Sequence, residues 1–164
     1  SYSHLYGFKT TGLRFFTVYG PWGRPDMAMF LFTDAIINNK PIKVFNNGNL
    51  ERDFTYIDDI TEGVVRIVET PLTNKTYNKD HYKVDNIGNS KSVKLMDFIT
   101  AIEESLDTTA KKEMLPMQPG DVEKTWANVD DLITDYEYRP NTSIKLGVQR
   151  FVEWYKDYFT PIAQ

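Results

Sequence analysis

Residues 12–27 read GLRFFTVYGPWGRPDM, and this stretch decides the fold. Its first part, residues 12–18, is rich in β-branched and aromatic side chains, which is typical of a buried parallel strand. The prolines and glycines of the following PWGRP segment predict a shaped loop, and Asp26 is placed to cap a helix behind it. Open α/β sheets bind ligands where a strand ends in such a loop. Arg24 is therefore a candidate anion-binding residue, and the alternative is a rigid turn with a solvated arginine.

The composition narrows the class of protein. With 164 residues, 41% of them hydrophobic, the chain is expected to form one domain with a real core. The net charge of −4 argues against general nucleic-acid binding. The absence of cysteine fits a reducing cytoplasm and excludes thiolate metal sites. No apolar run approaches the roughly 20 residues of a membrane span, so no membrane partner is expected.

Strands and helices are expected to alternate along the chain, which predicts an α/β fold. A polar stretch, residues 71–83, is expected to be a loop, and Asp58 is placed to cap the helix that precedes it. The expected strands cover 12–18, 41–45, 51–57, 82–88 and 112–115, and the expected helices cover 27–39, 58–68, 92–106, 129–136 and the segment from 142 or 143 to 158.

Arg52 is a second candidate anion-binding residue, because its planar fork suits phosphate or carboxylate. The alternative is an internal ion pair with Asp53, Asp58 or Asp59. These carboxylates have no histidine at ligand spacing, so no metal site is predicted. Asp121 in QPGD is placed either to orient a ligand hydroxyl or to cap a turn.

Two motifs of nicotinamide enzymes are absent from the sequence. There is no G-x-G-x-x-G loop, which would cradle a dinucleotide pyrophosphate. There is also no Tyr-x-x-x-Lys, whose i, i+4 spacing would place a tyrosine acid/base beside a lysine. No catalytic residue is therefore assigned in this chain.

Four segments together closely resemble the UDP-glucuronate 4-epimerases, which are extended short-chain dehydrogenases related to UDP-glucose 4-epimerase. The resemblance runs over essentially the whole chain, and it implies that residues 1–164 are the C-terminal, substrate-binding half of a Rossmann-type epimerase. The NAD-binding part and the catalytic Tyr and Lys would then lie in the missing half. The four segments are RFFTVYGPWGRPDM (14–27), NNGNLERDFTYIDDI (46–60), QPGDV (118–122) and RFVEWYKDYF (150–159).

The resemblance implies the function of the intact enzyme: it would interconvert UDP-glucuronate and UDP-galacturonate at C4 through a 4-keto sugar, with NAD as a recycled cofactor. It also implies a cytoplasmic homodimer. Strands 12–18 and 82–88 would belong to a larger parallel sheet, so the isolated chain is expected to self-associate or to be marginally stable. The alternatives are an epimerase or decarboxylase for another UDP-sugar, or a non-catalytic module that binds nucleotide sugars.

The same resemblance assigns roles near the reacting sugar. Phe15 and Phe16 match positions that flank the nicotinamide. Thr17 matches a substrate-side residue, and Arg24 matches an arginine that reads the C5 carboxylate of the sugar. By the same resemblance, Met27, Lys43 and Phe45 lie on the uridine side of the substrate, and Arg52 binds the diphosphate. Gln118 and Asp121 match residues that hold the phosphate and the ribose, and Gln118 replaces an arginine of the galactose enzymes.

Overall fold

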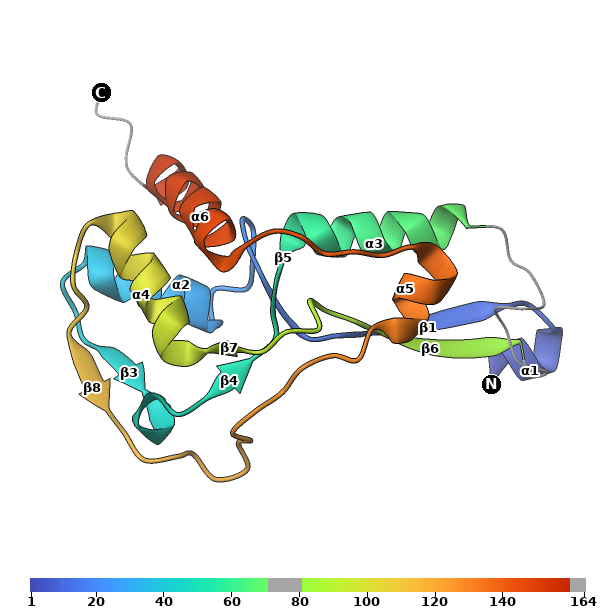
Figure 1. The fold of residues 1–164 in the computed structure, drawn as a ribbon, viewed down its shortest axis with the longest axis horizontal. Coiled ribbons are helices and arrows are strands. Elements are labelled where there is room, and N and C mark those ends of the chain that lie inside the picture. The colour runs from blue at the N-terminus through green and yellow to red at the C-terminus, as the bar shows by residue number, and fades with distance from the viewer. Residues whose placement is uncertain (71–80, 160–164) are drawn as a thin grey trace.

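The computed structural model describes residues 1–70 and 81–159, which form two lobes joined by short strands (Figure 1). Residues 71–80, most of the predicted loop 71–83, lie outside the described residues. Three of the four strand pairs are parallel, and helices flank them, which confirms the α/β class. Among the described helices, none is both long and apolar enough to cross a membrane.

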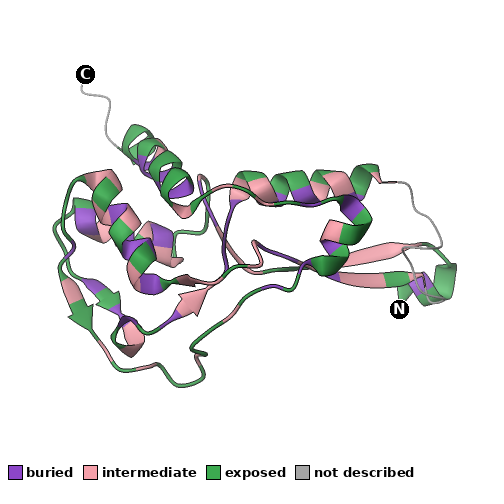
Figure 2. Cartoon of the chain, viewed as in Figure 1, coloured by how far each residue is buried: buried purple, intermediate pink, exposed green. Residues whose placement is uncertain are grey.

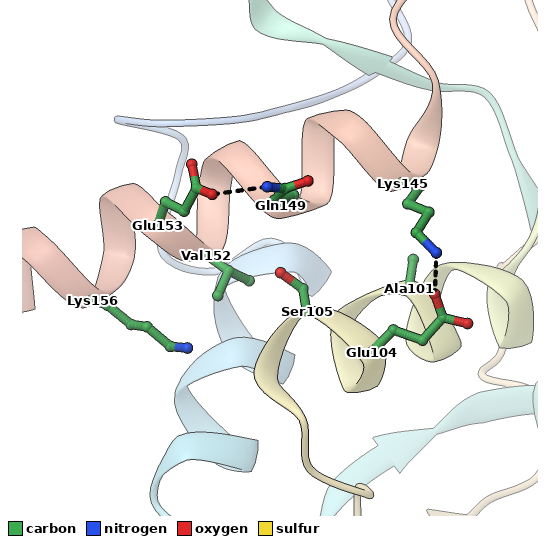
Figure 3. A pocket seen from close by; sticks show the side chains of 8 residues that line it. All are labelled: Ala101, Glu104, Ser105, Lys145, Gln149, Val152, Glu153 and Lys156. Atoms are coloured by element: carbon green, nitrogen blue, oxygen red, sulfur yellow. Dashed lines mark hydrogen bonds and ion pairs between the residues drawn. The ribbon is translucent and has the colours of Figure 1, made fainter.

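The helical lobe, on the left of Figure 1, packs three helices over a small parallel strand pair. Strands β3 and β8 pair in parallel, with Ile42 opposite Lys112. Helices α4 and α6 pack against each other, and Lys145 of α6 reaches Glu104 of α4 at 2.9 Å (Figure 3). The elements are α2 (Ala28–Ile37), β3 (Ile42–Val44), the 3₁₀ turn η1 (Phe45–Gly48), α4 (Leu95–Leu106), β8 (Lys112–Met114) and α6 (Ile144–Phe159).

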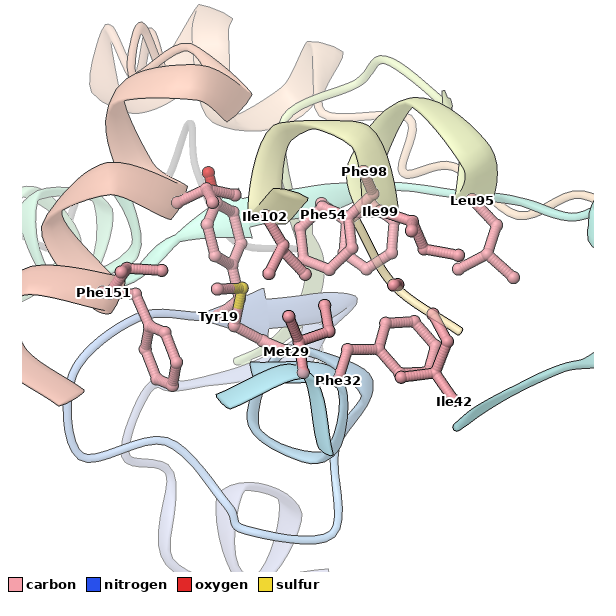
Figure 4. Packing of buried hydrophobic residues seen from close by; sticks show 14 of the residues in the cluster. Tyr19, Met29, Phe32, Ile42, Phe54, Leu95, Phe98, Ile99, Ile102 and Phe151 are labelled. Atoms are coloured by element: carbon pink, nitrogen blue, oxygen red, sulfur yellow. The ribbon is translucent and has the colours of Figure 1, made fainter. Parts of the chain in front are cut away.

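The core of the helical lobe is aromatic and aliphatic (Figure 4). The rings of Phe54 and Phe98 stack with centroids 4.0 Å apart, and Tyr19 meets Phe98 edge-on. Apolar positions of α6 recur every three or four residues and turn inward, as its buried stripe shows in Figure 2. On this helix Val148, Phe151 and Tyr155 are buried, whereas Tyr158 is exposed.

The sheet lobe, on the right of Figure 1, is built on one pair of parallel strands. Leu13 and Ile87 of these strands pack against Ile60 of α3 and Leu132 of α5. Val68, the last residue of the expected helix 58–68, is 77% exposed. The elements are α1 (Tyr2–Tyr6), β1 (Thr10–Phe15), α3 (Ile57–Glu69), β6 (Tyr82–Ile87) and α5 (Asp130–Tyr136).

Short strands join the lobes, and here the sequence-based boundaries were wrong. The predicted strand 12–18 is two strands, because the chain changes partner at Phe16: its amide donates to Ile87, and the next amide, of Thr17, donates to Asp53. The predicted strand 51–57 is likewise divided at Asp53. The elements are β2 (Thr17–Tyr19) parallel to β5 (Phe54–Tyr56), and β4 (Glu51–Arg52) antiparallel to β7 (Val93–Lys94).

Both predicted aspartate caps were also wrong. Helix α2 has Met27 at its N-cap, since the carboxylate of Asp26 accepts hydrogen bonds from Arg24 instead. Helix α3 begins one residue before Asp58, which lies in the first turn and pairs with Arg150 at 3.2 Å. An acidic residue in the first turn still complements the positive end of the helix dipole.

Candidate functional site

A cavity of about 430 Å³ opens at the junction of the two lobes. It lies at the carboxyl ends of the parallel strands β1, β2 and β5, where open α/β sheets bind ligands. Its walls are largely apolar, with backbone of the glycine-rich loop and one cation. The lining residues are Phe15, Phe16, Val18, Tyr19, Gly20, Pro21, Trp22, Gly23, Arg24, Met27 and Ile57.

The loop that forms one wall of this cavity is tightly folded. Gly20 has a φ of 141°, and a Cβ there would lie 2.5 Å from the side chain of Ile57, so only glycine fits. Two backbone hydrogen bonds, from Gly23 to Gly20 and from Met27 to Arg24, close successive turns at 3.2 Å each. The predicted shaped loop is therefore present.

Arg24 lies in this loop with its side chain 76% exposed. Its guanidinium donates to both carboxylate oxygens of Asp26, at 3.1 and 2.5 Å. This hydrogen bonding, stronger than the opposing effect of desolvation, holds the pKa of Asp26 below its usual value. Because the pair is exposed, a ligand anion competes with Asp26 for the fork at little desolvation cost.

Four of the predicted residues border the same cavity: Phe15, Phe16, Arg24 and Met27. Phe15 is 53% exposed, so part of its ring is accessible from the cavity that it lines. Thr17, the fifth residue of that region, is half-buried on β2 and is not part of the lining.

Arg52 and Asp121 form a second part of the candidate site. The Nη2 of Arg52 lies 2.6 Å from the Asp121 carboxylate, and its Nη1 donates to the carbonyls of Glu51 and Glu123. The predicted alternative, a pair with Asp53, Asp58 or Asp59, is therefore wrong in its partner. With its side chain only 19% exposed, the guanidinium is held in one orientation.

The surroundings of Arg52 carry more charge. Glu51, its neighbour, accepts a hydrogen bond from Ser92 at 2.6 Å and pairs with Lys124 at 2.9 Å. The hydrogen bond from Ser92 is the largest cause that lowers the pKa of Glu51, followed by that from Lys124. Glu51 is therefore ionised and occupied by its own partners, so it does not neutralise Arg52.

Besides Thr17, Arg52 and Asp121, three more predicted residues are absent from the lining of the cavity. Lys43 is exposed on β3, where it pairs in register with Glu113. Phe45 begins η1 and packs against the core of the helical lobe. Gln118 is exposed in the loop after β8, where its carbonyl accepts from the amide of Asp121. The assigned roles of these residues stay predictions.

Asp53 is a residue whose importance the sequence reasoning missed. It is fully buried, and its carboxylate accepts hydrogen bonds at 2.8–2.9 Å from the hydroxyl of Thr55 and from the amides of Asn89, Ser90 and Ala127. Asp53 thereby ties the strand that carries Arg52 to two loops. A charged residue directly before the largely apolar run 54–57 was the available signal, since buried charges require partners.

A second cavity, of about 390 Å³, lies between α4 and α6 (Figure 3). Its walls combine Glu104 and Glu153 with Lys145 and Lys156 around the small side chain of Ser105. The Lys145–Glu104 pair crosses it, and Gln149 donates to Glu153. None of the predicted site residues lies there. Among residues 1–70 and 81–159, no group of histidines and carboxylates is arranged to hold a metal ion.

The sequence is similar to known proteins over nearly its whole length. Protein CapI of Staphylococcus aureus is 53% identical over 97% of this chain and 51% of its own length. The probable UDP-glucuronate 4-epimerase of Rhizobium meliloti (strain 1021) is 45% identical over 94% of this chain and 49% of its length. The chain thus spans about half the length of the curated relatives that it matches.

The fold matches solved structures over most of the chain. The UDP-glucuronic acid 4-epimerase of Bacillus cereus, in complex with UDP-glucuronic acid and NAD, superposes with a TM-score of 0.79 and 34% identity, covering 90% of this chain and 45% of that one. Residues 1–85 match the family model described as the NAD dependent epimerase/dehydratase family. The chain therefore belongs to the NAD dependent epimerase/dehydratase family.

Proposed function

We propose that this chain is the substrate-binding part of an NAD-dependent UDP-sugar epimerase that interconverts UDP-glucuronate and UDP-galacturonate at C4. One observation carries the proposal: Arg24 and two aromatic rings, Phe15 and Phe16, border one cavity at the carboxyl ends of parallel strands. A cation beside apolar walls suits a sugar that carries a carboxylate. The relatives named for this activity support the assignment of the substrate.

Arg24 is the proposed reader of the C5 carboxylate. Its fork already binds a carboxylate, that of Asp26, through two parallel donors. The sugar carboxylate would replace Asp26 as the partner of the fork, with the same bidentate geometry. The hydroxyl of Thr17, on the adjacent strand β2, is the proposed second donor.

Arg52 and Asp121 are proposed to hold the diphosphate and the ribose. In this structure the carboxylate of Asp121 occupies Nη2 of Arg52. Phosphate oxygens would take over this donor, and Asp121 would then be released to accept from ribose hydroxyls. The proposed contacts for the uridine are Met27, Lys43 of strand β3 and Phe45, which begins η1. Gln118 is proposed to complete the diphosphate side as a neutral donor.

The residues present fit the nicotinamide end of NAD. The exposed ring of Phe15 and the half-buried ring of Phe16 offer flat apolar surface at the cavity, which suits a planar heterocycle. When bound, NAD would supply reversible hydride acceptance at the sugar C4, so that a 4-keto sugar forms and is reduced again on its other face. This chain orients the sugar and excludes water, while the acid/base pair is proposed to lie outside it.

A calorimetric titration of the chain with UDP-glucuronate, with UDP-galactose as the control ligand, tests the proposal. We expect UDP-glucuronate to bind more tightly, and Arg24→Ala to abolish this preference while leaving UDP-galactose binding unchanged. Loss of a bidentate contact to a charged group corresponds to about a tenfold weaker affinity. Equal affinity for the two nucleotide sugars would favour an epimerase for a neutral UDP-sugar instead.

A further inference from the structure

The loop that carries Arg24 contains a backbone conformation that its residues do not favour. Trp22 has a φ of 61°, in the left-handed region that glycine and asparagine occupy readily and that bulky side chains rarely adopt. The residue lies inside the first of the two tight turns, which runs from Gly20 to Gly23, two positions before Arg24. Such a conformation persists only where the surroundings hold it in place.

The surroundings of Trp22 are aromatic rings of helix α6. Its ring centroid lies 4.8 Å from that of Tyr158, at an interplanar angle of 75°, and 5.3 Å from that of Trp154. Edge-to-face contacts at these distances are favourable beyond the area that they bury. Trp22 itself is 72% exposed, so burial alone does not explain why the strained conformation is kept.

The two rings on α6 are themselves arranged to receive Trp22. Tyr158 and Trp154 lie one turn apart and stack with an interplanar angle of 16°. Trp154 packs onward against Phe30 and Phe151, which belong to the helical lobe. The contacts therefore run without a break from the core of the helical lobe to the loop.

We infer that Trp22, held by Trp154 and Tyr158, anchors the loop 20–27 and so positions Arg24 toward the cavity. Arg24 is too exposed to be held by burial, and its partner Asp26 belongs to the same loop. The ring contacts with α6 are thus the tie between the tip of this loop and the rest of the molecule. Trp22 and Tyr158 are positioning residues, and this role rests on the proposed function of Arg24 as the carboxylate reader.

Hydrogen–deuterium exchange tests the anchoring without any ligand. The amides of Gly23 and Met27 close the two turns of the loop and report its order. Tyr158→Ala should raise their exchange rates by about tenfold or more, and Tyr158→Phe, which keeps the ring, should restore protection. The matched control is Phe159→Ala, since Phe159 packs on Trp154 and Tyr158 but makes no ring contact with Trp22. Unchanged exchange in Tyr158→Ala would overturn the inference.

Affinity measurements test the consequence for specificity. We expect Tyr158→Ala to reduce the preference for UDP-glucuronate over UDP-galactose by about threefold to tenfold, with the neutral sugar unaffected. A loop that loosens while the preference stays intact would refute the positioning role. If the unmodified chain shows no preference, the proposed role of Arg24 fails, whereas the exchange experiment still decides whether the rings anchor the loop.

Discussion

Helices α2, α4 and α6 surround the core of the helical lobe, whereas in the sheet lobe the packed residues Leu13 and Ile87 lie on one face of the β1–β6 pair. On the other face, a Cβ added to Gly12 would meet nothing nearer than 3.7 Å, and its neighbours would be atoms of β6. The sheet lobe is therefore covered on one side at this point, while the helical lobe is enclosed.

Exposed apolar side chains occur in both lobes, and several of those in the sheet lobe belong to its N-terminal segment. Those at the N-terminal end of the sheet lobe include Tyr2, Leu5 and Tyr6, each at least 67% exposed, and Phe8 at 47%. The proposed site lies between the two lobes. Its Tyr19 wall belongs to the enclosed core of the helical lobe, and its Phe16 wall packs against the core of the sheet lobe. The two walls of the proposed site therefore differ in how firmly they are held.

The largest expected effect is a loss of stability on truncating a buried side chain, and its size should differ between the two cores. Ile99 and Ile87 are both fully buried, the first in the helical lobe and the second in the sheet lobe. We expect Ile99→Ala to lower the free energy of unfolding by about 4 kcal/mol and Ile87→Ala by about 2 kcal/mol, since a lobe open on one face relaxes into the cavity more completely. Urea denaturation measures both, and equal losses would contradict the comparison.

The next largest effect on stability compares two glycines of the sheet lobe, Gly63 on the packed side and Gly12 on the open face. A Cβ at Gly63 of α3 would lie 2.7 Å from the Tyr138 ring and 2.8 Å from Ile87. Gly63→Ala should therefore destabilise the protein by about 2 kcal/mol by overpacking, despite the better helix propensity of alanine. The control Gly12→Ala, on the open face, should instead raise stability by about 0.5–1 kcal/mol, because a glycine within a strand costs about that much relative to alanine and the added methyl group has room. Thermal or urea unfolding measures the stability of the two variants. If Gly63→Ala left the free energy of unfolding unchanged, α3 would not be tightly packed at this position.

The third effect concerns association. The exposed apolar residues of the sheet lobe should cause the chain to self-associate, and Leu5→Glu combined with Phe8→Glu should shift it toward the monomer. Leu31→Glu is the matched control, because Leu31 is 52% exposed but belongs to α2 of the helical lobe. Sedimentation velocity distinguishes the species. A monodisperse monomer before any substitution would show that the open face needs no cover.

The sequence predicted the elements better than their boundaries and partners. The apolar runs around residues 12–18 and 51–57 were recognised as strands, but their division at Phe16 and Asp53 follows from a change of strand partner, which depends on tertiary contacts. Asp26 has the residue type and place of a helix cap. Its nearest strong donor, however, is Arg24 two residues earlier, and that pairing cannot be read from cap statistics.

For the site, motif resemblance selected residues that the structure distributes over several places, among them the cavity and the Arg52–Asp121 pair. Phe15, Phe16, Arg24 and Met27 share the cavity because they follow one strand into one loop. Arg52 and Asp121 are 69 residues apart in sequence, and the fold alone brings them into contact. Sequence spacing carried no signal for that pair.

The smallest expected effect is a difference in pH dependence. Burial is the largest cause that raises the pKa of Asp85, against the opposing effect of Lys83, whose Nζ lies 3.1 Å away. The nearby carboxylates of Asp131 and Asp135 also raise it. The folded state therefore holds the Asp85 proton more tightly than the unfolded state does. Its contribution to stability is complete below the ordinary aspartate pKa of about 4 and is lost as the pH rises through the folded value.

Asp85→Asn should remove this decline, so that the unfolding free energies of the variant and the unmodified chain diverge from about pH 4 upward. Asp26→Asn provides a comparison of opposite sign, because Arg24 lowers the pKa of Asp26 and its contribution is lost as the pH falls. That second effect should be slight, since the pair is exposed to solvent. Urea titrations between about pH 3 and pH 7 measure both slopes. Parallel curves for Asp85→Asn and the unmodified chain would show that Lys83 neutralises Asp85 fully, and that the sheet lobe, although open on one face, tolerates a buried charge as well as an enclosed core would.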